Sequence, residues 1–269
     1  MNRNDIRVYY KDARNMDEID NESVHLVVTS PPYNLSFDYG VYKDNLSFDK
    51  YLKFVSNVFT VVYGKLVYGG RVAVNIPYVV QFNGKTFTNG RKRDFYLSYY
   101  QKIFDDIGYI MRDIIVWVKN NEIKSQKDIL GGGRTAWGSW CSPSNPSLRG
   151  CAELVLLFSK GSHKLDGNSN LVDITPEEFL HWTKNVWYIP SASSKSHPAI
   201  FPGELPRRLI KLFTYRNNII LDPFCGTGTT LWEAYKLGRK AIGYEINPGY
   251  KRIIDKKCHL KSRDLEGFF

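Results

Sequence analysis

Short apolar runs alternate along the chain with longer segments in which apolar residues recur at helical spacing. The run VHLVV at 24–28 is rich in β-branched residues and is soon followed by two prolines, which predicts a buried strand running into a loop. Residues 51–63 show the helical spacing, and GGRVAVNI at 69–76 predicts a turn followed by a strand. Further helices are predicted at 94–107, 205–214 and 231–237, and further strands at 114–119, 153–158, 218–221 and 240–244. This alternation predicts an α/β fold with a doubly wound, mainly parallel sheet.

Two long segments interrupt the pattern. Residues 78–93 are rich in Gly, Asn and basic residues, and residues 120–150 are rich in Gly, Ser, Pro and Trp. Loops of this length within a compact domain are usually functional or disordered, and Trp137 and Trp140 argue against simple disorder for the second. The length of 269 residues, with 43% hydrophobic residues, fits one large domain that has a real core.

The charge balance indicates the class of partner. Lysine and arginine number 37 against 27 acidic residues, and the formal net charge of +10 favours a polyanion such as nucleic acid. Charge alone is weak evidence, because many basic proteins bind no nucleic acid specifically. The first residues lack the apolar segment of a signal peptide, and no apolar run approaches the roughly 20 residues that span a bilayer. We therefore expect a cytoplasmic protein with no membrane partner.

The cysteines and histidines do not support a metal site. None of the four cysteines forms a C-x-x-C pair, and no two histidines stand at positions i and i+4. We interpret the cysteines as reduced thiols, most of them packed, and we expect no bound metal.

A glycine-rich turn follows the predicted strand at 218–221. The segment LDPFCGTGTTLWEA places Gly226 and Gly228 between a strand and a helix, where a glycine backbone bends tightly and approaches a ligand closely. Glu245 stands about twenty residues later, at the end of the next strand, where a carboxylate can accept both hydroxyls of a ribose. The turn is neither a P-loop nor G-x-G-x-x-G. A lone G-x-G can simply turn the chain, but Glu245 in this position favours a nucleoside-binding site.

A second turn, Ser30-Pro31-Pro32-Tyr33, follows the strand at 24–28. Two prolines fix φ and restrict the residue before them, so the Ser30 hydroxyl and the backbone carbonyls become rigid hydrogen-bond acceptors. Tyr33 offers a flat face for stacking. Such a turn suits a flipped base that is held by its amino group and sandwiched on a ring. The plain alternative is an ordinary proline turn with a packed tyrosine.

Together the two motifs resemble those of the DNA amino-methyltransferases, which carry [D/N/S]-P-P-[Y/F] as catalytic motif and F-x-G-x-G as cofactor motif. Here the second motif is FCGTG at 224–228. The catalytic motif comes first, an order similar to the beta group of the family, which is a circular permutation of the usual methyltransferase chain. KDARNM before the first strand, HPAIFPGELPRRLI at 197–210 and GYEINPGY after the glycine turn extend the resemblance over most of the chain. The resemblance implies S-adenosylmethionine as cofactor and a circularly permuted, Rossmann-like methyltransferase fold.

The same resemblance assigns roles to individual residues. Asp12 falls in the segment near the cofactor adenine, Phe201 in the segment near its methionine end, and Glu245 at the ribose. The implied cofactor residues are Asp12, Phe201, Asp222, Pro223, Phe224, Cys225, Gly226, Gly228, Thr229 and Glu245. The implied catalytic residues are Ser30, Pro31, Pro32 and Tyr33.

The expected chemistry is direct methyl transfer to an exocyclic amine. The sulfonium methyl is already electrophilic, so the enzyme mainly aligns the amine and accepts its protons, here through Ser30 Oγ and the Pro31 carbonyl. No Pro-Cys occurs, and Cys225 lies in the cofactor loop, which separates this chemistry from methylation of cytosine C5. In the family, serine at the first motif position leans toward N4 of cytosine, and aspartate or asparagine toward N6 of adenine. Ser30 therefore favours cytosine, with N6 of adenine as the alternative.

The resemblance implies one methyltransferase domain over 1–269, with a catalytic part at 1–119 and a cofactor-binding part at 197–250. Recognition of double-stranded DNA is expected from the two loops at about 78–93 and 120–150, and from a small DNA-recognition insert at 161–195. The candidate DNA contacts are Lys85, Arg91, Lys92, Arg93, Arg134 and Arg149. Each of these taken alone is more simply interpreted as solvated surface charge, and so is the basic segment KRIIDKKCHLKSR near the C-terminus.

Two alternatives from other classes remain open. An RNA or protein-glutamine amino-methyltransferase can share the P-P-Y chemistry, although its cofactor site usually comes first in the chain. A non-catalytic nucleic-acid binder can keep the fold, although both motifs are intact here. The sequence leaves open the recognition site, whether the protein forms a homodimer, and whether a cognate restriction endonuclease acts beside it.

Overall fold

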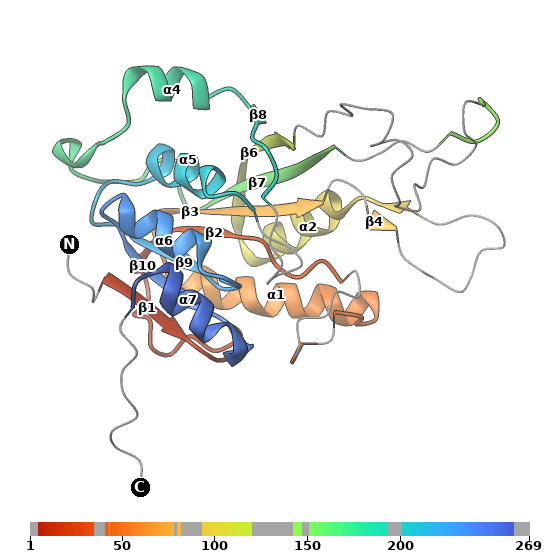
Figure 1. The fold of residues 1–269 in the computed structure, drawn as a ribbon, viewed down its shortest axis with the longest axis horizontal. Helices are drawn as coiled ribbons and strands as arrows, with labels where there is room; N and C mark the ends of the chain where they lie inside the picture. Colours follow the sequence, from red (N-terminus) through yellow and green to blue (C-terminus); the bar gives the residue numbers. More distant parts are fainter. Residues whose placement is uncertain are drawn as a thin grey trace, which may run out of the picture.

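An eight-stranded sheet forms the centre of the protein, whose structure is a computed structural model (Figure 1). The structure describes residues 5–34, 41, 42, 44–77, 80, 81, 93–119, 142–146, 151–192 and 201–260. The strands lie in the order β1-β10-β9-β2-β3-β7-β6-β8. Their bounds are β1 (Ile6–Tyr9), β2 (Val24–Thr29), β3 (Leu66–Pro77), β6 (Tyr109–Val118), β7 (Ala152–Lys160), β8 (Val186–Tyr188), β9 (Ile219–Asp222) and β10 (Lys240–Tyr244). Strand β7 runs antiparallel to β3 and β6, and the other described pairs of this sheet are parallel, which confirms the predicted α/β class.

Strands from opposite ends of the chain lie side by side in this sheet. Strand β1 pairs with β10, and β2 pairs with β9, so the two C-terminal strands fill the space between the two N-terminal ones. This arrangement confirms the predicted circular permutation. It also brings the carboxyl ends of four parallel strands to one edge, where ligands bind in open α/β sheets.

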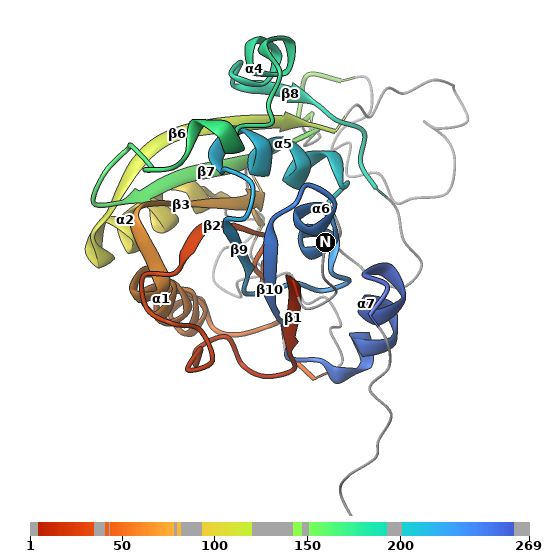
Figure 2. The same cartoon turned by 90° about the vertical axis from the view of Figure 1, so that its left-hand side faces the viewer.

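Helices cover both faces of the sheet (Figure 2). On one face α1 and α2 bury Val55, Phe59 and Phe104 against the strands. On the other, α5, α6 and α7 bury Leu209 and Leu231 among others. The helix bounds are α1 (Phe48–Lys65), α2 (Tyr96–Ile107), α5 (Glu204–Phe213), α6 (Thr229–Lys236) and α7 (Lys251–Lys257). None of the helices in the described ranges has the length and apolar character needed to cross a bilayer.

The prediction of a turn at 69–70 was wrong. Strand β3 begins at Leu66, directly after α1, and its pairing with β2 shifts between Val24 and Leu26, so the glycines lie in a bulge within the strand. Gly69 has φ +74°, and a Cβ there would stand 1.9 Å from the Lys164 carbonyl oxygen. The backbone requires glycine at this position, but the two glycines mark a bulge within the strand and not a reversal of the chain.

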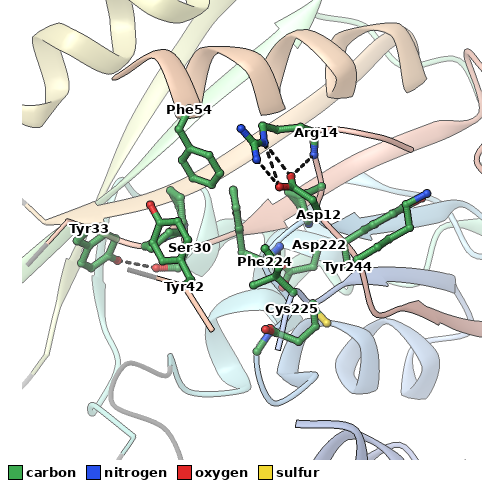
Figure 3. A pocket seen from close by; sticks show the side chains of 18 of the residues that line it. Asp12, Arg14, Ser30, Tyr33, Tyr42, Phe54, Asp222, Phe224, Cys225 and Tyr244 are labelled. Atoms are coloured by element: carbon green, nitrogen blue, oxygen red, sulfur yellow. Dashed lines mark hydrogen bonds and ion pairs between the residues drawn. The ribbon is translucent and has the colours of Figure 1, made fainter. Parts of the chain in front are cut away.

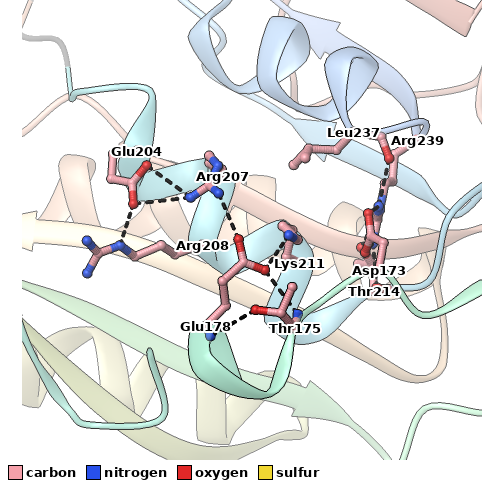
Figure 4. Close-up of polar contacts among 10 residues, drawn as sticks. All are labelled: Asp173, Thr175, Glu178, Glu204, Arg207, Arg208, Lys211, Thr214, Leu237 and Arg239. Carbon is pink, nitrogen blue, oxygen red and sulfur yellow. Dashed lines mark hydrogen bonds and ion pairs between the residues drawn. The ribbon is translucent and has the colours of Figure 1, made fainter. Parts of the chain in front are cut away.

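Residues 161–192 fold onto the edge and one face of the sheet. They form η2 (Ser169–Leu171), α4 (Pro176–Trp182) and strand β8, which pairs with β6. Thr175 and Glu178 cap α4, and the Glu178 carboxylate also forms ion pairs with Arg207 and Lys211 of α5 (Figure 4). Arg207 lies over the Trp182 ring, 4.9 Å from its centroid. The segment is thus fastened to the sheet by packing and charge, and its predicted role in DNA recognition stays a prediction.

A buried arginine ties this segment to the cofactor half of the chain. Arg239, which precedes β10, is 1% exposed and pairs with both carboxylate oxygens of Asp173 (Figure 4). Its guanidinium also donates to the Thr214 carbonyl at 2.8 Å. Since a buried charge must be paired to be tolerated, Asp173 and Arg239 fix how the two segments meet.

Candidate active site

A cavity of about 470 Å³ opens at the carboxyl ends of β1, β2, β9 and β10. Its volume lies in the range of small-molecule binding sites. Every predicted catalytic and cofactor residue except Gly228 lines it. The structure therefore brings together two motifs that lie about 190 residues apart in the chain.

The Ser-Pro-Pro-Tyr turn is held rigidly at one side of the cavity (Figure 3). Ser30 Oγ lies 2.6 Å from the Tyr33 hydroxyl, and Pro31 is buried. Just after the turn, the Asn34 side chain exchanges two hydrogen bonds with the Leu46 backbone, at 2.8 and 2.7 Å. One bond within the turn and two bonds just after it therefore restrict the position of the Ser30 hydroxyl.

Polar side chains of β3 and β7 form hydrogen bonds with the Tyr33 hydroxyl. Asn75 of β3 donates from Nδ2 to the Tyr33 hydroxyl at 2.6 Å and to Glu153 of β7 at 2.5 Å. Lys119 pairs with the other oxygen of Glu153. Burial and the Glu153 charge raise the pKa of Tyr33 well above its usual value, so the phenol stays protonated. The Tyr33 ring is 7% exposed, and its predicted stacking on a base stays a prediction.

The glycine turn on the opposite side is organised by Glu245. Its two carboxylate oxygens accept from the backbone N–H groups of Gly226 and Asn247, each at 2.9 Å. Gly226 has φ +50° and lines the cavity. Gly228 lies outside the lining and instead provides the left-handed residue, φ +76°, from which α6 begins. Its absent side chain also leaves room for α7, since a Cβ would stand 3.3 Å from Cys258 Sγ.

Two aspartates of the cavity are engaged with neighbouring groups. Asp222 Oδ1 accepts from Thr29 Oγ1 at 2.6 Å and from the Phe224 N–H at 3.1 Å, and burial raises the pKa of Asp222 to about 6. Asp12 accepts from the backbone and guanidinium of Arg14 (Figure 3). Burial raises the pKa of Asp12, but the bonds from Arg14 outweigh it and hold the pKa below its usual value.

The comparisons with known proteins identify the family. The family model described as DNA methylase, for N6 and N4 methyltransferases, matches residues 24–256. The chain belongs to this DNA methylase family.

Individual relatives match nearly the whole length of this methylase. The type II methyltransferase M.MjaI of Methanocaldococcus jannaschii is 32% identical and matches 96% of this chain and 93% of its own length. TTHA0409 of Thermus thermophilus, solved in complex with S-adenosyl-L-methionine, is 26% identical with a TM-score of 0.72, over 97% of this chain and 95% of that one. The cytosine-N4-specific PvuII DNA methyltransferase shares the fold, with a TM-score of 0.66 at 22% identity over 96% and 87% of the two chains. The cofactor of the family is S-adenosylmethionine.

Several residues that line the cavity were not predicted from the sequence. Lys50, Lys53, Phe54 and Asn57 form one face of α1 that lines the cavity, and Phe54 packs 5.8 Å from the Phe224 ring. Their spacing of three and four residues was a readable signal for a shared face. Asn75 and Glu153 were visible only as polar positions inside otherwise apolar strands.

The predicted DNA contacts fall largely beyond what the structure describes. Lys85, Arg91, Lys92, Arg134 and Arg149 lie outside the described residues. Arg93 begins the short strand β5 (Arg93–Asp94), which pairs with β4 (Val80–Gln81). The contacts of these residues with DNA stay predictions.

Cofactor binding by the methylase is expected to depend on pH through Glu245. Burial raises the pKa of Glu245 to about 7, whereas the two backbone bonds lower it less. In its predicted role Glu245 accepts the ribose hydroxyls as an ionised carboxylate, so the affinity is expected to be lost as the pH falls through about 7. We expect the Kd for S-adenosylmethionine to rise by about tenfold between pH 8 and pH 6, as titration calorimetry would measure. A flat profile would contradict a role for this carboxylate, and Glu245→Gln is expected to remove the dependence.

Proposed function

We propose that this methylase transfers the methyl group of S-adenosylmethionine to N4 of cytosine at specific sites in double-stranded DNA. The observation that carries the proposal is the position of Ser30 in the same cavity as the Glu245 turn. Ser30 also carries the choice of base, because serine at this motif position leans toward cytosine in the family that the sequence resembles. N6 of adenine is the second candidate, since its amine makes the same demands on the site.

The proposed cofactor site uses the residues that the glycine turn presents. Glu245 would accept the ribose hydroxyls, and Phe224 would pack against the adenine beside Phe54. Phe201 and Thr229 would border the amino-acid end. When bound, S-adenosylmethionine supplies an electrophilic methyl on a positively charged sulfur, which suits a cavity that contains several carboxyl groups.

The proposed catalytic step depends on acceptors held in fixed positions. Ser30 Oγ and the Pro31 carbonyl would accept the two hydrogens of the target amine, which localises the nitrogen lone pair toward the methyl group. After the methyl group has moved from sulfur to nitrogen, the methylated amine would release one proton to water, because the Ser30 hydroxyl and the Pro31 carbonyl accept hydrogen bonds but are too weakly basic to keep that proton. The site reaches the base only if the base leaves the helix, so base flipping belongs to the proposal.

The relatives support a proposed biological setting. M.MjaI is a type II methyltransferase, which supports a role in restriction–modification beside a separate endonuclease. We propose that the segments 78–93, 120–150 and 161–195 read the DNA.

Analysis of the methylated product tests this function. The purified protein is incubated with S-adenosylmethionine and mixed-sequence DNA, and the nucleosides are identified by mass spectrometry. We expect N4-methylcytosine. N6-methyladenine would keep the family chemistry but overturn the weight placed on Ser30. An unmethylated product, with cofactor binding demonstrated, would move the substrate to RNA or protein.

A further inference from the structure

A half-buried lysine lies behind the cofactor loop. Lys257, in the last turn of α7, donates from Nζ to the hydroxyl oxygens of Thr227 and Thr229, each at 2.9 Å. Within the described part of the chain, no carboxylate forms an ion pair with Lys257. The other basic residues of the helix, Lys251, Arg252 and Lys256, are exposed. Partial burial costs Lys257 some of its hydration, and its ammonium group bonds to two hydroxyls instead. Lys257 therefore differs from the solvated basic residues of the same helix.

Each of the two threonine hydroxyls can still donate a hydrogen bond. A hydroxyl that accepts from an ammonium group still has one proton to donate. Thr227 and Thr229 both line the cavity, so these protons are available to a group bound there. Thr229 is also the first residue of α6, whose N-cap Gly228 makes no side-chain cap. Hydroxyl donors, the helix terminus and the ammonium charge thus favour an anion at one place.

Apart from two exposed lysines, the charges elsewhere in the cavity are of the opposite sign or already paired. Asp12, Asp222 and Glu245 contribute carboxyl groups that would repel an anion. Lys11 pairs with Glu18, and Arg14 pairs with Asp12. The exposed Lys50 and Lys53 of α1 are the remaining cations of the lining. The cofactor has a single anionic group, the carboxylate of its amino-acid end.

We propose that Lys257 is a positioning residue that turns the Thr227 and Thr229 hydroxyls toward the cofactor carboxylate. The inference rests on the proposed cofactor site and concerns how the site selects its ligand. It predicts that Lys257 matters only for ligands that carry the carboxylate.

The test compares two ligands that differ in that one group. S-adenosylmethionine and its decarboxylated analogue are titrated by calorimetry into the wild type and Lys257→Met, with no DNA present. We expect Lys257→Met to weaken S-adenosylmethionine about tenfold, or about 1.4 kcal/mol, and to change the analogue by less than about twofold. The exposed neighbour variant Lys256→Met is the matched control, and both of its affinities are expected to match the wild type.

Three outcomes overturn the proposal. Equal weakening of both ligands means that Lys257 supports the loop without regard to the carboxylate. An unchanged affinity for both means that it has no role. A selective loss in Lys53→Met and not in Lys257→Met assigns the carboxylate to α1. Failure of the wild type to bind either ligand would instead refute the proposed cofactor site itself. Thermal unfolding of each variant confirms that the compared proteins are folded.

Discussion

Replacing Ser30 with alanine is expected to lower kcat by about 100- to 1000-fold. The alanine removes the oxygen that would accept a hydrogen bond from the target amine. The turn itself should survive, because Tyr33 keeps its bond from Asn75 and Asn34 keeps its bonds to Leu46. The Kd for S-adenosylmethionine should therefore stay within about twofold of the wild type. Single-turnover methylation and calorimetry measure the two quantities separately.

A matched control separates this effect from loss of any buried hydroxyl. Tyr100 lies under α1 and donates to or accepts from Tyr51 at 2.8 Å, away from the cavity lining. Tyr100→Phe deletes one buried hydroxyl bond, whereas Ser30→Ala deletes a half-buried one, and Tyr100→Phe should cost about 1 kcal/mol of stability with kcat unchanged. Ser30→Ala with nearly full kcat would remove the serine from the mechanism.

The second large effect is expected at Glu245. Glutamine in this position keeps one acceptor oxygen, and its amide nitrogen must face a backbone N–H of Gly226 or Asn247. Two N–H donors then face each other, so the glycine turn loses one of the hydrogen bonds that hold it. A bound ribose also loses its charged acceptor. We expect Glu245→Gln to weaken S-adenosylmethionine about 100-fold at pH 8, which corresponds to about 2.7 kcal/mol.

Glu233 provides the control for a buried carboxylate near the same loop. It lies on α6, is 8% exposed against 9% for Glu245, and pairs with Lys236 outside the cavity lining. Glu233→Gln should leave the cofactor Kd within about threefold of the wild type. Comparable losses in both variants would mean that the effect reports general damage to α6 and β10.

The parts of the fold that were predictable are those with a strong local pattern. Strands β2, β7 and β10 and helices α1, α2 and α5 follow from runs and helical spacing in the sequence. Arg7 interrupts the apolar residues of β1, and β8 has only three residues, so neither strand shows the continuous apolar run that made the equally short β9 predictable. These strands exist because β10 and β6 offer them a free edge, which is a property of the assembled sheet.

The parts of the candidate site that could be predicted are the two local motifs, the Ser-Pro-Pro-Tyr turn and the glycine turn. Contacts that depend on strand register could not be predicted. The antiparallel register that sets Pro77 opposite Glu153 puts Asn75 and Glu153 on the same face, as diagonal neighbours. No local pattern contains that register. Lys257 is a similar case, because the basic helix is visible in the sequence but the lysine that turns inward depends on where α7 packs.

The strand order β1-β10-β9-β2 also bears on how the protein is made. During translation β1 and β2 leave the ribosome long before β9 and β10, and they cannot take their final neighbours until residues up to Tyr244 have emerged. Until then β2 presents one unpaired edge, which is the kind of surface on which nascent chains aggregate. A product truncated before Ile219 would keep that edge permanently and would lack the glycine turn. With the proposed cofactor site, a chain must extend at least to Glu245 to bind S-adenosylmethionine, so shorter products of translation are expected to lack methyl-transfer activity.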